Sequence, residues 1–169
     1  MRCFFPVAVM AAVGSWSVPA VAASAIESGA TFACTAVAVW DGDGPIWCAE
    51  GPRIRLAGVA AREIDGSCRA GHPCPVASGL VARNTLVGML GGPRGTLATG
   101  HVKVASVPLT CVSQGDGRGG RIAAWCTAPR VGDLSCALVG SGVALRWDRY
   151  WRDGRCAQAT GRTVQARAR

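Results

Sequence analysis

The sequence predicts a mainly β domain of the α+β class, a small barrel of five strands with two to three helices. Short runs rich in β-branched residues alternate with clusters of glycine, proline and aspartate, which is typical of strands joined by tight turns. Two longer segments space their apolar residues as a helix does. Once an N-terminal export segment is set aside, the remaining length suits one domain.

The first residues have the pattern of a secretory signal peptide. Arg2 supplies a positive charge, residues 3–13 are almost entirely apolar, and the alanine-rich stretch 20–23 follows. This apolar run is too short for a membrane span, and no later run approaches the roughly 20 apolar residues that a spanning helix needs. We expect residues 1–23 to be a signal peptide cleaved near residues 22–23, and the mature protein to be periplasmic or secreted.

The domain is expected over residues 31–150 and begins with three strands. Residues 31–40 alternate and are rich in β-branched side chains. Dense turn chemistry in 41–45 then leads into a second strand at 46–48. Another turn precedes a third strand over 53–59. These elements form an antiparallel meander.

A loop, a helix and two more strands follow. Glycines and prolines exclude a regular element from 64–75, whereas apolar residues in 76–90 fall near helical spacing. The Gly-Gly-Pro sequence that follows ends this helix. Strands are expected over 103–112 and 121–127, joined by the loop 113–120.

The last elements are a second helix over 133–145, with Asp133 near its N-terminus, and an arginine-rich tail over 151–169. Five strands in this order, with a helix after the third, can close into a small OB-type barrel whose gap the helix fills.

Nine cysteines support export. Cys3 leaves with the signal peptide, and an even set of eight remains, as in a disulfide framework. Zinc is the alternative, but the chain has no C-x-x-C pair and its two histidines lack metal-ligand spacing. Eight cysteines allow about a hundred pairings, which sequence alone does not decide. Facing positions on the expected elements favour Cys34–Cys48, Cys68–Cys74, Cys111–Cys126 and Cys136–Cys156.

The formal net charge is +8, and all but one of the 18 basic residues are arginines, the exception being Lys103. Arginine suits bidentate contact with phosphate better than lysine does. Nucleic acid is therefore one expected partner. A chain so rich in alanine, glycine and arginine can also reflect a GC-rich genome, so composition leaves both explanations open.

Two parts of the sequence carry candidate chemistry. The first combines Trp-Asp-Gly-Asp-Gly at 40–44 with Arg-Ile-Arg-Leu-Ala-Gly-Val-Ala-Ala-Arg-Glu at 53–63. The second combines Gly-Arg-Ile-Ala-Ala-Trp-Cys at 120–126 with Gly-Asp-Leu at 132–134. Each motif is short, and their order and spacing are more informative than any one of them.

In these motifs the chain resembles the staphylococcal-nuclease-like (thermonuclease) family. That family has an Asp-Gly-Asp-Thr turn and an Arg-Leu-x-Gly-Ile-Asp-Ala-Pro-Glu strand, followed by a Gly-Arg-x-Val-Ala strand and an Asp-Leu-Asn helix entry. The resemblance covers residues 33–150. It implies an OB-type barrel that hydrolyses phosphodiester bonds, with DNA or RNA as the partner. We expect a monomer without a membrane span.

The resemblance also implies roles for particular residues. Arg55 and Arg121 match the catalytic arginines, which would donate to the charge that develops on phosphate. Glu63 matches the catalytic glutamate, which would orient or deprotonate water. Asp43 matches the first calcium ligand, and Ala61 would offer its backbone carbonyl to the same ion.

The chain departs from the family at the metal site. Ala60 stands where the family has its second metal aspartate, so the resemblance implies a divalent cation, calcium in the family, at a weakened site. Asp41 is a turn former or a further ligand. Three other acidic residues are expected to be surface charges that could replace the lost carboxylate: Glu50, Asp65 and Asp116.

Trp147 and Trp151 lie among arginines and are candidates for stacking on bases. Arg118 is a second candidate for nucleic-acid contact and could take the role of Arg121. Three other tryptophans are expected to pack in the core: Trp40, Trp47 and Trp125.

The leading hypothesis is an exported nuclease. The first alternative is a non-catalytic OB module that binds nucleic acid, and the second is a cell-envelope interaction protein. Retention of Glu63 favours the nuclease because binding alone does not need it, whereas Ala60 favours a binding module.

Overall fold

The computed structural model describes residues 26–152 and 156, so the expected signal peptide and most of the expected tail lie outside the described residues. Within these residues no helix is long and apolar enough to cross a membrane. The elements are β1 (Thr31–Val39), β2 (Ile46–Cys48), β3 (Arg53–Leu56), β4 (Val59–Ala60), α1 (Gly79–Met89), β5 (Val102–Asp116), β6 (Ile122–Ala128), β7 (Gly132–Asp133), α2 (Leu134–Gly140) and β8 (Leu145–Arg146).

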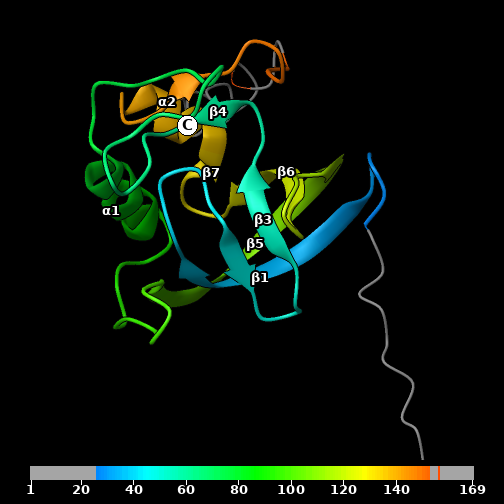
Figure 1. Cartoon of the computed structure of the whole chain (residues 1–169). Helices are drawn as coiled ribbons and strands as arrows, with labels where there is room; N and C mark the ends of the chain where they lie inside the picture. Colours follow the sequence, from blue (N-terminus) through cyan, green and yellow to red (C-terminus); the bar gives the residue numbers. More distant parts are fainter. Residues whose placement is uncertain (1–25, 153–155, 157–169) are drawn as a thin grey trace, which may run out of the picture.

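Five strands form a closed barrel, as the sequence predicts. Their order is β3-β2-β1-β5-β6, and each neighbouring pair in this order is antiparallel. The ring closes through a parallel pairing of β3 with β6, in which Ile54 lies opposite Ile122 and Leu56 opposite Ala124 (Figure 1). β7 extends the sheet beyond β6, and β4 pairs with β8 in a separate small ribbon. This mixed, mainly β barrel is consistent with an OB-like fold.

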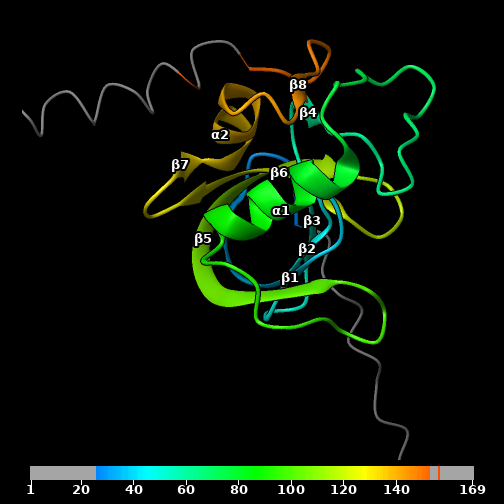
Figure 2. The ribbon, with the colours of Figure 1, turned by 90° about the vertical axis from the view of Figure 1, so that its left-hand side faces the viewer.

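The core lies inside the barrel and beneath α1. Side chains of β1 alternate between buried and partly exposed, and Cys34 and Ala36 point inward. Helix α1 crosses in front of the strands when the molecule is viewed from its left side (Figure 2), and its Leu86 is fully buried with Leu90, the C-cap residue. Burial of these apolar side chains is the main stabilising contribution in a domain of this size.

Helix α1 begins later than its apolar spacing predicts. Val76 is 98% exposed and lies before the helix, which starts at Gly79. Ser78 is the N-cap, because its hydroxyl accepts a hydrogen bond from the Val81 amide at 3.3 Å. A side chain at Gly79 would approach the Glu63 carbonyl oxygen to 2.2 Å. A glycine at this position therefore lets the helix start directly against the backbone of Glu63.

Several other boundaries differ from the prediction. β3 ends at Leu56 instead of continuing to residue 59, because Gly58 turns the chain with a φ of +73°. β5 continues to Asp116, through a register shift, into the expected loop. α2 stops at Gly140, and Gly142 follows with a φ of +74°. Asp133 caps α2, as expected, by accepting from the Cys136 amide at 3.1 Å.

All four predicted disulfides are present. Cys34–Cys48 and Cys111–Cys126 each join two neighbouring barrel strands. Cys68–Cys74 closes the loop before α1, and Cys136–Cys156 links α2 to the tail. With all eight of these thiols paired, the zinc alternative is excluded for them. Four disulfides in a domain of this size indicate an oxidising compartment.

We expect Gly58→Ala to lower the free energy of unfolding by about 2–3 kcal/mol. A Cβ at this position would lie 2.4 Å from the ring of the fully buried Trp125, and the backbone φ is positive. Gly88→Ala is the control, since nothing lies within 4 Å of a Cβ there. It lies in α1 and should raise stability by about 0.5–1 kcal/mol. Denaturant unfolding with the disulfides intact measures the free energy of unfolding of both variants. Equal free energies for the two variants would contradict the close contact at Gly58.

Candidate functional site

A cleft of about 480 Å³ opens beside the end of β3. Four segments line it: 55–59 from β3 and its exit, 69–72 from the loop before α1, 114–123 from the end of β5 to the start of β6, and 147–152 after β8. The loop before α1 and the segment after β8 lie at the same, upper end of the molecule (Figure 1). The cleft is therefore built from segments that are far apart in the sequence.

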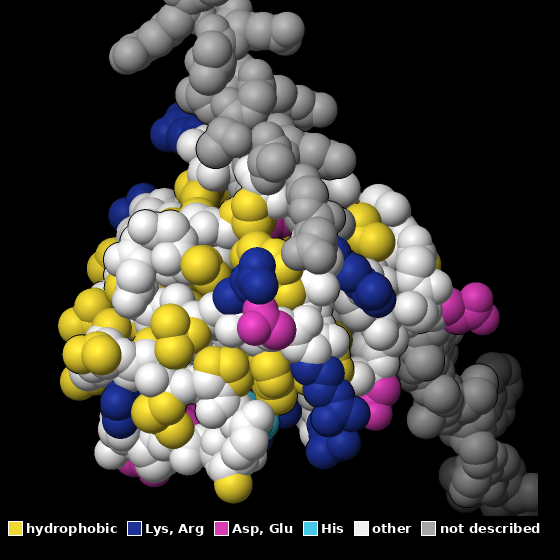
Figure 3. Space-filling model, turned by 90° about the horizontal axis from the view of Figure 1, so that it is seen from above, with side chains coloured by type: hydrophobic (Ala, Val, Ile, Leu, Met, Phe, Trp, Pro, Cys, Tyr) yellow, Lys and Arg dark blue, Asp and Glu magenta, His cyan; other side chains and the backbone are white. Residues whose placement is uncertain are grey.

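The cleft is strongly basic. Asp116 is the one acidic side chain among the described residues that line it, against six arginines: Arg55, Arg69, Arg118, Arg121, Arg149 and Arg152. The view from above shows Lys and Arg side chains spread over this end of the molecule, with a few acidic side chains beside them (Figure 3). A cleft lined by charge of one sign concentrates ligands of the opposite sign. The charge of this cleft therefore favours an anionic ligand.

Arg55 lies on β3 and is held from two sides. Its Nη2 donates to Asp43 Oδ2 at 2.7 Å, and the two side chains are only 14% and 8% exposed. Its guanidinium also lies 5.8 Å from the ring centroid of Trp147. The turn that carries Asp43 is also hydrogen-bonded to β3, because the Leu56 amide donates to the Asp43 carbonyl at 2.9 Å. Arg55 is therefore preorganised in the cleft wall.

Asp41 and Asp43 form a buried acidic pair, 7% and 6% exposed, behind Arg55. The Asp43 amide donates to Asp41 Oδ1 at 3.3 Å. Burial raises the pKa of Asp41 to about 8, and the neighbouring Asp43 charge adds to this. Burial also raises the pKa of Asp43, against the opposing effect of Arg55. Burial therefore favours the neutral form of Asp41, whereas Arg55 stabilises the charged form of Asp43.

Glu63 lies just after β4 and is paired with a residue that its motif does not contain. Arg69 Nε donates to Glu63 Oε1 at 2.7 Å, with the arginine side chain 54% exposed and the glutamate 24%. Arg69 itself lines the cleft, whereas Glu63 is not among the lining residues. The expected catalytic carboxylate therefore stands behind a guanidinium that separates it from the cleft.

Arg121 lies immediately before β6, and its Nε donates to the Arg118 carbonyl at 2.9 Å. Burial lowers the pKa of Arg121, and the positive charges of Arg55 and Arg69 lower it further. Arg118 also lines the cleft, with its amide donating to Asp116 Oδ1 at 2.8 Å. Both candidates for the second arginine thus reach the cleft, and the guanidiniums of Arg55 and Arg69 both act on Arg121.

The two stacking candidates have different surroundings. Trp147 lines the cleft, with ring centroids 4.1 Å from His72 and 4.8 Å from Tyr150. Trp151 instead packs edge-on against Trp125 at 5.4 Å and is not among the cleft residues. Trp125 is fully buried, as expected. Trp40 and Trp47 are only half-buried and pack against His101, with ring centroids 5.0 and 4.2 Å away.

The residues around Asp43 do not fit a preformed calcium site. Ala60 is fully buried and offers no side-chain oxygen. Asp43 is already paired with Arg55, and a backbone hydrogen bond from Ala61 also stabilises its charge. A calcium ion needs several oxygen ligands and binds best where some are anionic. In this structure the Arg55 guanidinium already pairs with the Asp43 carboxylate.

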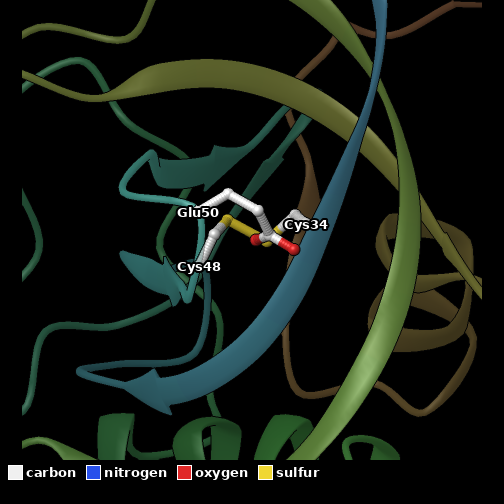
Figure 4. Close-up of side chains that lie close together, drawn as sticks. All are labelled: Cys34, Cys48 and Glu50. Atoms are coloured by element: carbon white, nitrogen blue, oxygen red, sulfur yellow. A yellow bond between two sulfur atoms is a disulfide. The ribbon is translucent and has the colours of Figure 1, made fainter. Parts of the chain in front are cut away.

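Among the described residues, one group of three potential metal ligands lies close together: Cys34, Cys48 and Glu50. Figure 4 shows that the two sulfurs are joined in a disulfide, so they cannot bind a metal as thiolates. The Glu50 carboxylate accepts hydrogen bonds from the amide and hydroxyl of Thr35. Asp65 accepts from Ser67 and Asp116 from Arg118. None of these three acids joins Asp43 in a ligand group.

Sequence motifs missed several cleft residues, notably Arg69, His72 and Tyr150. A signal for the first two was present, because both lie between Cys68 and Cys74, which the predicted disulfide closes into a short ring. No motif marks Tyr150, although it lies between Trp147 and Trp151, which the sequence analysis places among arginines. Compared with known proteins, the chain matches no family model, no curated protein and no solved structure.

The pKa of Asp41 gives a prediction about stability in the absence of divalent cations. In the unfolded chain this carboxyl ionises near 3.8, whereas in the fold it stays protonated to about 8. The folded state therefore binds the extra proton between these values, so the contribution of Asp41 to stability is complete below pH 3.8 and is lost as the pH rises towards 8.

Asp41→Asn keeps a neutral side chain of the same shape at every pH. We expect it to raise the melting temperature relative to wild type by about 5 °C more at pH 8.5 than at pH 5. Asp65→Asn, at an exposed acid, is the control and should show no such difference. A melting-temperature gain that is the same at both pH values would show that Asp41 is ionised throughout.

Proposed function

We propose that this protein is an exported nuclease that hydrolyses phosphodiester bonds of DNA or RNA in the basic cleft. The observation that carries the proposal is the meeting of Arg55 and Arg121 in one cleft, with Glu63 one guanidinium away. The resemblance of their motifs to the staphylococcal-nuclease-like family supports it, as does the OB-like barrel. The N-terminal sequence and the four disulfides support export.

In the proposed reaction the two arginines bind the phosphate that is cleaved. Negative charge grows on its non-bridging oxygens as water attacks, and Arg55 and Arg121 would donate hydrogen bonds to these oxygens. Asp43 and Trp147 hold the Arg55 guanidinium before substrate arrives, so little reorganisation is needed. This arrangement favours the transition state because the donors are already in place.

Glu63 is the proposed general base. The water oxygen attacks phosphorus, its proton passes to the Glu63 carboxylate, and the P–O bond to the leaving sugar oxygen breaks. The leaving oxygen takes a proton from solvent. Because the donors around Asp43 do not fit calcium, no step of this mechanism passes through a metal ion.

The second candidate is a non-catalytic module that binds nucleic acid in the same cleft. The pairing of Glu63 with Arg69 favours it, since a carboxylate held by a guanidinium is a weaker base. Both candidates need the basic cleft and the aromatic ring of Trp147. They differ in whether Glu63 acts on water.

We expect Glu63→Gln to lower the cleavage rate by about 100- to 10,000-fold, as for the loss of a general base, with the melting temperature unchanged. Arg55→Lys and Arg121→Lys should also lose most activity, because lysine keeps the charge without the bidentate fork. Arg130→Lys, at an exposed position outside the cleft, is the control. The assay uses single- and double-stranded DNA and RNA, with Ca²⁺, Mg²⁺, Mn²⁺ or chelator. Cleavage that is absent in wild type, with binding retained, would establish the second candidate.

We also expect calcium binding by the free protein to be weaker than about 1 mM, as in the weakest natural calcium modules. Isothermal titration with Ca²⁺ in the absence of nucleic acid measures it. Ala60→Asp returns the carboxylate that the family has, at a fully buried position. Because an uncompensated buried charge is costly, this variant should be less stable than wild type and regain stability when Ca²⁺ is added. Micromolar binding by wild type would contradict the unfavourable ligand set.

A further inference from the structure

The loop before α1 brings two functional side chains into the cleft that the motifs do not contain. The Cys68–Cys74 disulfide closes residues 68–74 into a ring with a Cα–Cα distance of 5.7 Å. Arg69 and His72 lie inside this ring, and both line the cleft. The centroid of the His72 ring lies 4.1 Å from that of the Trp147 ring, which lines the same cleft.

Hydrogen bonds from Arg62 also hold the backbone on both sides of the ring. Arg62 Nη2 donates to the Pro75 carbonyl at 2.9 Å, and its Nη1 donates to the Gly66 carbonyl at 2.8 Å. Within the ring, the His72 amide donates to the Arg69 carbonyl at 3.0 Å. A cross-link and anchors on both sides reduce the conformations open to such a loop. The ring therefore presents Arg69 and His72 from a constrained backbone.

The pair of Arg69 and Glu63 does little for the stability of the fold. The arginine side chain is 54% exposed, and exposed ion pairs contribute little net stability. Arg69 instead adds a third guanidinium to the charge around Arg55 and Arg121, at an electrostatic cost in the free protein. A bound polyanion would remove this cost, because each phosphate brings negative charge between the arginines.

We propose that the ring 68–74 forms a second phosphate subsite, in which Arg69 and His72 bind the phosphate next to the one that is cleaved. Arg69 leaves Glu63 when this phosphate binds, so the substrate itself frees the base. His72 stays beside Trp147 and donates a ring N–H. The inference rests on the proposed function, since it adds a neighbouring phosphate to the same strand.

Binding tests the subsite independently of cleavage. The probes are a short single-stranded oligodeoxynucleotide with phosphorothioate linkages and inorganic pyrophosphate. We expect Arg69→Ala to weaken the affinity for both by about tenfold, as for the loss of a charge-assisted contact. Arg69→Lys should weaken the affinity less than Arg69→Ala does. His72→Ala should weaken it by a smaller but measurable factor. Arg94→Ala removes the same charge at an exposed site outside the cleft and should change affinity less than about twofold.

Salt dependence separates a phosphate contact from a structural role. Arg69→Ala should reduce the slope of log affinity against log salt for the oligonucleotide by about one, whereas Arg94→Ala should leave it unchanged. In cleavage assays Arg69→Ala should raise KM about tenfold and leave kcat within about threefold, because Glu63 keeps its place and loses a competitor. An unchanged slope together with an unchanged KM would overturn the inference.

The double variant Cys68→Ser with Cys74→Ser opens the ring and leaves the other three disulfides in place. We expect oligonucleotide affinity to fall about as far as in Arg69→Ala, with a melting temperature that confirms the fold. Wild-type affinity in this variant would show that ring closure is not needed and would overturn the proposed role of the ring.

The two proposals fail in different ways. Cleavage by wild type with no loss of affinity in Arg69→Ala overturns the subsite alone. Loss of affinity in Arg69→Ala with no cleavage by wild type supports the subsite and overturns the nuclease. Wild-type protein that binds neither probe overturns the subsite as well.

Discussion

The parallel pairing of β3 with β6 is the constraint on which the rest of the structure depends. It closes the barrel, and it sets Arg55 directly opposite Ala123. Arg121 lies just before that strand, so closure brings the two arginines to one end of the barrel. The pairing continues past the strand, since the Ala57 amide donates to the Ala124 carbonyl at 2.9 Å. Backbone hydrogen bonds between β3 and β6 thus bring Arg55 and Arg121, which are far apart in the sequence, to the same end of the barrel.

Charge in this molecule is arranged in two layers. The outer layer is the basic wall of the cleft, and the inner layer is the buried pair of Asp41 and Asp43. Arg55 joins the layers, because its guanidinium reaches Asp43 while it lines the cleft. An arginine that neutralises a buried carboxylate occupies the place that a cation needs. The same ion pair therefore preorganises Arg55 and leaves Asp43 with a cationic partner already in place, which disfavours a preformed calcium site.

The sequence predicted most of the elements whose form depends on residues close together in the chain. Alternating side chains in β1, the glycines after α1 and the capping role of Asp133 act within a few residues. The start of α1 was placed too early because Val76 continues the apolar spacing, although it is exposed. What overrides the pattern is the Ser78 cap and the close approach of Gly79 to the Glu63 backbone, which is a contact between separate segments.

The sequence by itself predicted a five-stranded barrel and favoured the four disulfide pairings that the structure shows, and its motifs singled out Arg55 and Arg121 as functional candidates. Strand spacing and turn residues carry that information, because register and closure follow from them. Only the tertiary structure decided which partner each charge would have. Glu63 meets Arg69, and Asp43 meets Arg55, because the disulfide-closed loop and the β3 strand fold against the same end of the barrel. Ion pairs depend on distance in space, and a motif specifies distance only along the chain.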